Sequence, residues 1–352
     1  MKAQKVAEVP SLGVEAAVDA LRSAVAAQAP GMTAEQRLAE VAALFADDLL
    51  WVERALSRAS LEGPAPGTDA ARHLIDRGGK RLRPLSLLLS AACFGRIPEP
   101  ARELAVVAEL VHSATLLHDD VIDDGTERRG AQASRILWGN GVSVLGGDLL
   151  LVNGLERTAR HAPEIMPDLV ATLRRLVEGE IIQLRGRVEL DVSEATYERI
   201  LRDKTASLFA WATRTGARLA AADTRSIDAM ASFGEELGVA FQLVDDDLDY
   251  TGEASGKTLF ADLRQGKLTL PLVLAAAKDP ALMTPLRRIF AGDQEPVVLV
   301  SRAVAESGAC DEVRRRAREH TTRAIQALEA VATSPARSLL ASVATELAAR
   351  AA

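Results

Sequence analysis

Apolar segments with helical spacing follow one another along almost the whole chain, and this feature constrains the fold more than any other. The first segment runs from Thr33 to Leu56 and ends at the Gly-Pro-Ala-Pro-Gly sequence of residues 63–67. The later segments are long and are separated by short breaks that contain Gly, Pro or Asp. They cover residues 85–94, 102–118, 142–158, 167–184, 194–221, 226–250 and 269–277. The pattern predicts an all-α protein, a bundle of ten or more helices.

Composition agrees with a helical chain that buries a large core. Aromatic residues make up only 3% of the 352 residues and β-branched runs are scarce, which excludes a β-sandwich or a β-barrel. No linker rich in Pro, Ser or Gly divides the chain after residue 68. We therefore expect a single domain over residues 33–352, preceded by an extension of residues 1–32 that is disordered or carries one short helix.

Charge and cysteine usage narrow the class of protein. The net charge is −7 and no Lys/Arg tract is long enough to follow a phosphate backbone, so we expect no nucleic-acid partner. Cys93 and Cys310 lie far apart and outside any metal-ligand spacing, so we expect two core thiols in a reducing cytosol. No apolar stretch reaches the roughly 18 to 20 residues that span a bilayer. The sequence therefore predicts a soluble, cytoplasmic protein without a transmembrane segment.

A first acidic cluster follows the apolar run of residues 104–117. In an α-helix, Asp119 and Asp123 lie on one face about 6 Å apart along the axis, with Asp120 roughly 100° round from Asp119. Three carboxylates placed in this way repel one another unless a cation lies between them. Clustered carboxylate oxygens suit a hard divalent ion, and the cluster therefore favours Mg²⁺.

A second acidic cluster repeats this spacing. Asp245, Asp246 and Asp249 follow the apolar run of residues 237–244 in the same i, i+1, i+4 arrangement. One acidic helix end is usually a solvated face, but two clusters of matching geometry are better explained as two walls of one cleft. Mg²⁺ keeps several waters and bridges a few carboxylates to substrate phosphates. The two clusters together predict a cleft that binds metal ions and a phosphorylated ligand.

Basic residues near these clusters suit a phosphorylated ligand. The sequence GGKRLRP at residues 78–84 places two glycines and three cations just before an apolar run. A loop of this kind at the start of a helix offers backbone N–H groups and point charges to an anion. The other candidates are Arg128, Arg129, Lys204, Lys257 and Lys267. Any one of these cations alone is more often solvent-exposed than functional.

In this order, the motifs resemble those of the trans-type (head-to-tail) polyprenyl diphosphate synthases, and most of all the long-chain octaprenyl-type members. The matching sequences are GGKRLRP at 78–84, DDVIDDGTERRG at 119–130, KTASLF at 204–209, FQLVDDDLD at 241–249 and GKTLFADLRQGKLTLP at 256–271. The resemblance implies the isoprenoid synthase fold, with helices around a central cavity and both acidic motifs facing across it, and a homodimer. It also implies a prenyltransferase of isoprenoid biosynthesis, which repeatedly condenses an allylic diphosphate (farnesyl, geranyl or dimethylallyl) with isopentenyl diphosphate.

The resemblance assigns roles to individual residues. The ligands of three Mg²⁺ ions would be Asp119, Asp120, Asp123, Asp245, Asp246 and Asp249, whereas Asp124 and Asp247 match no ligand position. The allylic diphosphate would be complemented by Arg128, Lys204 and Lys257, with Lys204 also in the catalytic set. Isopentenyl diphosphate would be held by Lys80, Arg83, His112 and Arg129. The positions near the allylic carbon are Thr205 and Gln242, and Lys267 completes the substrate-binding set.

Product length in this family depends on a tunnel beside the helix of the first acidic motif. Ala114 and Thr115, five and four residues before Asp119, stand where short-chain members carry bulky aromatic residues. Val111 continues this wall, so no aromatic plug lies within about 16 Å of Asp119 along the axis. On the facing helix, Leu155 is a candidate for the terminating residue and equally a plain core leucine. The missing plug predicts an all-trans product of about eight prenyl units.

Three other functions compete with this interpretation. A geranylgeranyl diphosphate synthase makes a shorter product by the same chemistry. A class I terpene cyclase needs no isopentenyl diphosphate site and carries an Asn/Ser/Glu-type second metal motif. A non-catalytic synthase subunit predicts degraded acidic motifs, but both motifs are complete here.

One residue departs from the family pattern. Phe260 stands where relatives commonly have Gly. A glycine can adopt a positive φ, whereas a phenylalanine is strained there, so the path of this loop is an open question.

Overall fold

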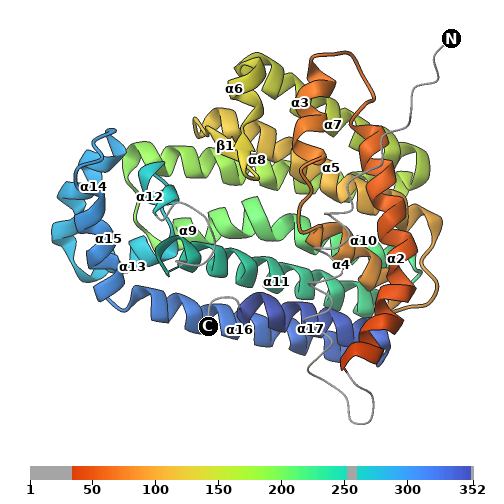
Figure 1. Cartoon of the computed structure of the whole chain (residues 1–352). Helices are drawn as coiled ribbons and strands as arrows, with labels where there is room; N and C mark the ends of the chain where they lie inside the picture. Colours follow the sequence, from red (N-terminus) through yellow and green to blue (C-terminus); the bar gives the residue numbers. More distant parts are fainter. Residues whose placement is uncertain (1–33, 252–259, 350–352) are drawn as a thin grey trace. The chain divides into compact units, whose positions relative to one another are not determined.

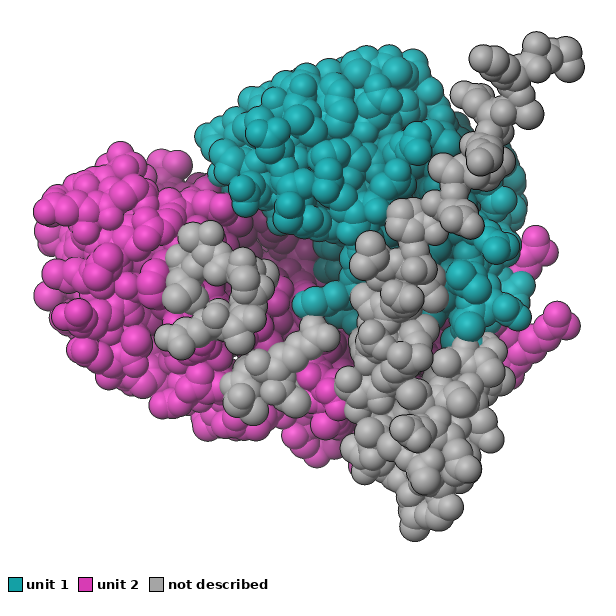
Figure 2. All heavy atoms as spheres, in the orientation of Figure 1, with its two compact units in different colours: residues 1–85, 102–162 teal, residues 86–101, 163–352 magenta. Residues whose placement is uncertain are grey.

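The computed structural model of the chain describes residues 34–251 and 260–349, and these residues are mostly helical (Figure 1). They form two compact units, which Figure 2 draws in different colours. Unit 1 comprises Met1–Leu85 and Arg102–Ala162, and unit 2 comprises Ser86–Ala101 and Pro163–Ala352. The extension of residues 1–32 lies outside the described residues, and the single domain over residues 33–352 stays a prediction.

Unit 1 consists of helices and one small hairpin. Its complete elements are α2 (Ala34–Ala59), α3 (Gly67–Ile75), β1 (Glu127–Arg128), β2 (Ala131–Gln132), α6 (Ser134–Trp138) and α7 (Asn140–His161). Two further helices, α4 (Leu82–Ala92) and α5 (Glu99–Ile122), each have one end in unit 1 and the other in unit 2. The amide of Asn153 on α7 donates a hydrogen bond to the Ala59 carbonyl (3.0 Å), which fastens α7 to the end of α2.

Unit 2 contains the remaining helices. Its α-helices are α8 (Met166–Glu189), α9 (Glu194–Ile200), α10 (Ser207–Leu219), α11 (Thr224–Thr251), α12 (Ala261–Arg264), α13 (Leu270–Lys278), α14 (Met283–Phe290), α15 (Val297–Glu306), α16 (Ala309–Ala327) and α17 (Pro335–Ala349). Three short 3₁₀ helices are η1 (Pro163–Ile165), η3 (Pro280–Leu282) and η4 (Leu328–Ala330). A π-helical turn, η2 (Leu201–Ala206), joins α9 to α10.

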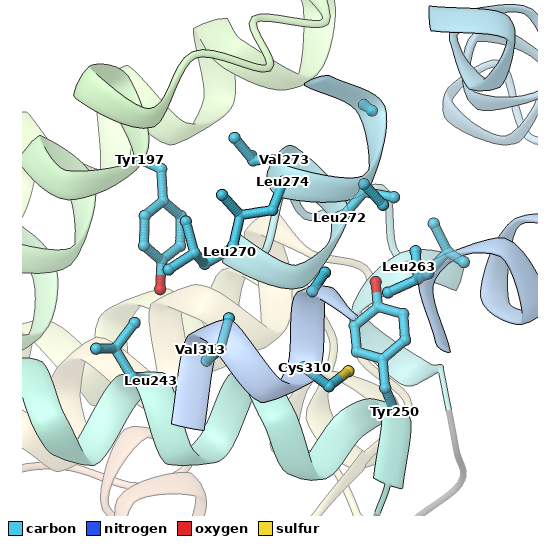
Figure 3. Close-up of a cluster of buried hydrophobic side chains, with 14 of the residues drawn as sticks. Tyr197, Leu243, Tyr250, Leu263, Leu270, Leu272, Val273, Leu274, Cys310 and Val313 are labelled. Atoms are coloured by element: carbon cyan, nitrogen blue, oxygen red, sulfur yellow. The ribbon is translucent and has the colours of Figure 1, made fainter. Parts of the chain in front are cut away.

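Apolar side chains from several helices form the core of unit 2. Figure 3 shows Tyr197 of α9, Leu243 of α11, Leu270 of α13 and Val313 of α16 in one buried cluster. Burying side chains of this size stabilises a fold by about 1.5–3 kcal/mol each. The cluster therefore holds α11, which carries the second acidic motif, against its neighbours.

The predicted all-α fold of ten or more helices is confirmed, and each long apolar segment coincides with helices. Both cysteines are free and buried, as expected. Among the helices of the described residues, none combines the length and apolar character that crossing a membrane needs.

Two local structures were not predicted. One is the β1–β2 hairpin, whose turn residues Arg129 and Gly130 have φ angles of 52° and 72°. A two-residue turn with two positive φ angles matches the twist of the strands it joins, but Asn-Gly is its usual sequence signal. The other is the π-helical turn η2, which interrupts a segment predicted as continuous helix.

Candidate active site

The GGKRLRP loop joins α3 to α4 and separates its three cations. Arg81 has a φ of 47° and a side chain that is only 2% exposed. Lys80 is exposed and Arg83 is half-buried in the first turn of α4. Arg81 is therefore held inside unit 1, whereas Lys80 and Arg83 remain accessible to a ligand.

Arg81 is bound by two carboxylates that the sequence analysis missed. Its Nε donates to Glu53 Oε1 (2.7 Å), its Nη1 to Glu109 Oε1 (2.6 Å) and its Nη2 to the Ile75 carbonyl (3.2 Å). Burial alone would lower the pKa of Arg81, but the charges of Glu109 and Glu53 outweigh it and raise that pKa. The loop is thus fastened by buried ion pairs to α2 and α5.

The hairpin directs its two arginines to different partners. Arg128 donates from Nε to Asp120 Oδ1 (2.8 Å), and its Nη2 lies 2.6 Å from the same oxygen. Arg129 donates from Nη1 to the Leu74 carbonyl (3.0 Å), and its Nη2 lies 3.5 Å from Glu109 Oε1. The turn therefore places Arg128 at the first acidic motif and Arg129 beside the GGKRLRP loop.

The first acidic motif occupies the end of α5. The Asp123 N–H donates to the Asp119 carbonyl (2.8 Å), so the helical spacing continues one residue past Ile122. Asp120 is 1% exposed, and its Oδ2 is buried without a hydrogen-bond partner. Burial raises the pKa of Asp120, and the adjacent Arg128 opposes that rise. Among the residues that the structure describes, Asp120 Oδ2 is therefore a buried acceptor with no hydrogen-bond donor.

His112 lies on α5 about two turns before Asp119, among the arginines of unit 1. Burial holds the pKa of His112 well below its usual range, and the positive charges of Arg83, Arg129, Arg81 and Arg128 lower it further. The imidazole is therefore neutral at physiological pH and can donate a hydrogen bond from one ring nitrogen. The structure thus brings His112 together with three of the predicted phosphate-binding residues.

The second acidic motif lies in the last turns of α11, where Asp246 is the centre of a buried network. Asp246 Oδ2 accepts hydrogen bonds from the Tyr197 hydroxyl (2.7 Å) and the Leu270 N–H (3.2 Å), and Oδ1 accepts one from the Gln242 amide (2.9 Å). Gln242 Oε1 in turn accepts a hydrogen bond from the Thr205 hydroxyl (3.1 Å). Burial raises the pKa of Asp246 to about 7. Three predicted site residues, Thr205, Gln242 and Asp246, thus form one chain of hydrogen bonds.

Tyr197 is a site residue that the sequence analysis missed. It is fully buried, and burial beside Asp246 raises its pKa well above the usual range, so its hydroxyl donates to the carboxylate. No local sequence signal marks it, because Tyr197 is a single residue 49 positions before Asp246.

Asp249 orients the start of α12. Its Oδ1 accepts a hydrogen bond from the Ala261 N–H (2.9 Å) and its Oδ2 accepts one from the Asp262 N–H (3.3 Å). Lys267 lies 3.5 Å from Asp262 in the same region. The predicted residue Lys257 lies outside the described residues.

Asp247 lies apart from these side chains, as the family pattern implies. It is buried, and both of its carboxylate oxygens accept hydrogen bonds from Arg314 Nη1 on α16 (3.1 and 3.2 Å). Asp247 therefore ties α11 to α16.

Lys204 and Thr205 are carried by the π-helical turn η2. Single π-type turns occur most often at functional sites. The neighbouring helix α8 approaches this turn at Gly179, where a Cβ atom would lie 2.9 Å from the Lys204 nitrogen. The Lys204 ammonium forms an ion pair with Glu180 of α8, another residue that the sequence analysis missed. Helix α8 therefore fixes both the backbone and the charge of Lys204.

The predicted tunnel residues lie on α5 and α7. Val111 and Ala114 are buried, Thr115 is half-buried and donates to the His112 carbonyl (2.8 Å), and Leu155 is half-buried. Helix α7 faces α5 here, since a Cβ on Gly154 would meet Val111 Cγ2 at 4.0 Å. No aromatic side chain occupies this wall at the predicted positions.

The carboxylate oxygens of both acidic motifs are ligand atoms of the type that a hard cation prefers. An ionised carboxylate offers about four lone-pair sites, and Asp246 uses three of them for the protein donors above. Asp120 Oδ2 has none of its sites used. Within residues 34–251 and 260–349, no three His, Cys, Asp or Glu side chains are grouped closely enough to hold a metal ion. The two motifs belong to different units, so their opposition across one cleft stays a prediction.

Comparison with known proteins assigns the family. A family model described as polyprenyl synthetase matches residues 67–306, more than half of the chain. The chain belongs to the polyprenyl synthetase family. It is 36% identical over 278 residues to the all-trans-nonaprenyl-diphosphate synthase (geranyl-diphosphate specific) of Rhodobacter capsulatus, over 77% of this chain and 85% of the relative. It is 39% identical over 247 residues to heptaprenyl diphosphate synthase component 2 of Geobacillus stearothermophilus, over 69% of this chain and 77% of the relative.

A solved structure of the family has the same fold. The polyprenyl synthase of Caulobacter crescentus CB15, crystallised with calcium and isoprenyl diphosphate, matches with a TM-score of 0.82 at 34% identity. The match covers 88% of this chain and 97% of that one. The isoprenoid synthase fold is thereby confirmed, and the chain is a polyprenyl diphosphate synthase, a prenyltransferase. Members of this family use a divalent metal.

Proposed function

We propose that this synthase condenses an allylic diphosphate with isopentenyl diphosphate repeatedly, to an all-trans polyprenyl diphosphate of about eight units, with release of diphosphate. The observation that carries the proposal is the meeting of two basic segments in unit 1, where the Arg129 guanidinium lies against Gly79 of the GGKRLRP loop and donates to the Leu74 carbonyl. A terpene cyclase has no use for such a second diphosphate site. The names of the relatives, heptaprenyl and nonaprenyl synthases, support a long product and bracket the proposed length.

The allylic diphosphate binds at the acidic motifs. Three Mg²⁺ ions would be held there by Asp119, Asp120, Asp123, Asp245, Asp246 and Asp249. When bound, Mg²⁺ acts as a Lewis acid that neutralises charge on the diphosphate oxygens. Arg128, Lys204 and Lys257 complement the remaining charge and stabilise the diphosphate as the allylic C–O bond breaks. The chain Thr205–Gln242–Asp246 supports this proposal because it fixes the Gln242 amide beside the motif.

Isopentenyl diphosphate binds at the basic group of unit 1. Lys80, Arg83 and Arg129 hold its diphosphate, and the neutral His112 donates a hydrogen bond to it. The double bond then attacks the allylic cation and a new C–C bond forms. The released diphosphate accepts the proton that is lost, which restores an allylic product that is five carbons longer. Lys267, close to Asp262 in unit 2, completes the binding set.

The product leaves this centre along α5, where Val111, Ala114 and Thr115 leave room for it. Purified protein should convert geranyl diphosphate, isopentenyl diphosphate and Mg²⁺ into a product of about eight units, by chromatography of the dephosphorylated lipid. EDTA should abolish turnover and added Mg²⁺ should restore it. In Ala114→Phe, the aromatic ring should block the tunnel and shorten the product.

The rate of the first condensation is the internal control for Ala114→Phe, because the new ring lies away from both diphosphate sites. An unchanged product length in this variant would remove the tunnel interpretation. A wild-type product that stops at fifteen carbons would refute the long chain, and a cyclic hydrocarbon would favour a terpene cyclase.

A homodimer completes the proposed enzyme. Four apolar side chains on α8, at positions 170, 177, 181 and 188, lie within one narrow face of the helix. Their exposed fractions are 47% for Val170, 59% for Val177, 58% for Ile181 and 89% for Val188. Exposed apolar side chains that share one face of a helix are typical of interaction sites. We assign this α8 stripe to a second copy of the chain.

A further inference from the structure

Glu109 is a buried carboxylate that the proposed mechanism does not use. Its side chain is 3% exposed, and its Oε1 lies 2.6 Å from Arg81 Nη1 and 3.5 Å from Arg129 Nη2. A buried carboxylate costs several kcal/mol unless it is paired and hydrogen-bonded. Glu109 therefore needs these two arginines, and both of them depend on its position on α5.

Arg81 is an internal partner and not a ligand of substrate. All three of its nitrogens donate to protein acceptors, namely Glu53, Glu109 and the Ile75 carbonyl. With a side chain that is 2% exposed, it has no surface to offer to a diphosphate. Its charge instead balances Glu109.

Arg129 is bound by two protein groups, and its side chain is 15% exposed. Glu109 and the Leu74 carbonyl bind its two terminal nitrogens, and the guanidinium lies against Gly79, where a Cβ atom would come within 2.9 Å of Nη2. A guanidinium has five N–H donors, so about three remain for a phosphate group. Its orientation is thus set before substrate arrives.

We infer that Glu109 is a positioning residue for isopentenyl diphosphate, which holds the Arg129 guanidinium in its binding orientation while Arg81 serves as the counter-ion of Glu109. The inference rests on the proposed isopentenyl diphosphate site. Glu109 also lies between the charges of Arg81 and Arg129, which would otherwise repel one another. Glu109 touches no substrate.

The test is Glu109→Gln, which keeps the shape of the side chain but removes its charge. Steady-state kinetics should show the KM for isopentenyl diphosphate raised about tenfold, as expected when the ion pair that orients Arg129 loses its negative partner. The KM for the allylic diphosphate and kcat should change less than about threefold, because Arg129 does not contact the leaving diphosphate. Glu109→Asp, which keeps the buried charge, should fold in any case and show an intermediate KM.

Glu103→Gln is the matched control. Glu103 lies on the same helix and forms a similarly buried ion pair with Arg157 (2.6 Å), away from the GGKRLRP loop. This variant should lose comparable stability and keep both KM values. If Glu103→Gln raised the KM for isopentenyl diphosphate as much as Glu109→Gln does, a general loosening of α5 would explain the effect and the inference would fail.

A double-mutant cycle tests whether Glu109 affects the binding of isopentenyl diphosphate by positioning Arg129. In the Arg129→Gln background, Glu109→Gln should add less than about twofold to the KM, because the group it positions is gone. Full additivity would overturn the inference. Failure of the proposed function is distinguishable, because wild-type protein would then not consume isopentenyl diphosphate at all.

Discussion

At the scale of single residues, Phe260 shows how a departure from the family pattern is accommodated. Its φ of 61° lies in the left-handed region, where a side chain costs roughly 1 kcal/mol or more. The ring packs against Tyr250, with 5.9 Å between ring centroids, and joins the core of unit 2. Phe260 therefore takes the conformation that a glycine would take, and aromatic contact offsets the strain.

Replacing Phe260 by Gly and by Ala separates these two effects. Both variants lose the ring, but only Gly relieves the positive φ, so Phe260→Gly should be more stable than Phe260→Ala by about 1 kcal/mol. Urea unfolding followed by circular dichroism measures the difference.

The control is Ala171→Gly, at an exposed position within α8 where the backbone is helical. This substitution should destabilise the protein by about 1 kcal/mol. Equal stability of Phe260→Gly and Phe260→Ala would show that φ is not the cause.

At the scale of elements, the contact between α8 and η2 decides where Lys204 lies. Two glycines on α8 differ sharply in the space around them. A Cβ on Gly179 would lie 2.9 Å from the Lys204 nitrogen, whereas the nearest atom to a Cβ on Gly186 is Leu268 Cδ1 at 3.9 Å. The close approach at Gly179 is therefore specific to the turn that carries Lys204, the proposed catalytic lysine.

We expect Gly179→Ala to displace η2 and Gly186→Ala to leave it in place. Gly179→Ala should destabilise by about 1–3 kcal/mol through overpacking, whereas Gly186→Ala should be neutral or stabilising by up to about 1 kcal/mol. Because Lys204 would move, Gly179→Ala should also lower kcat/KM for the allylic diphosphate about tenfold or more. Unfolding and kinetic measurements on the pair check both effects, and equal behaviour of the two variants would contradict the role of this contact.

At the scale of the whole molecule, the α8 stripe predicts the oligomeric state. Light scattering coupled to gel filtration should give twice the mass of one chain. Ile181→Arg places a charge in the stripe and should shift the protein toward the monomer, because burying an unpaired charge in an interface is costly. Val298→Arg on α15 is the control, since Val298 is equally exposed (64%) but lies outside the stripe. A monomeric wild type, or a dimer that Ile181→Arg leaves intact, would contradict the assignment.

Sequence alone determined the helical class and the family of this protein, because both depend on local patterns. Each of these patterns occupies a short stretch of sequence. They are the helical periodicity, the carboxylates at i and i+4, and motifs such as GGKRLRP. The acidic motifs therefore fall at the predicted helix ends, and the predicted site residues Thr205, Gln242 and Asp246 are joined by hydrogen bonds.

Only the tertiary structure decided which side chains support those motifs. Glu53, Glu109, Tyr197 and Glu180 are single residues far along the chain from their partners, and no spacing rule marks them. Their roles arise because burial makes an unpaired charge or hydroxyl costly, so each must find a partner that only the fold brings near. The π-helical turn and the left-handed Phe260 have the same origin, since contacts with other helices override local backbone preference there.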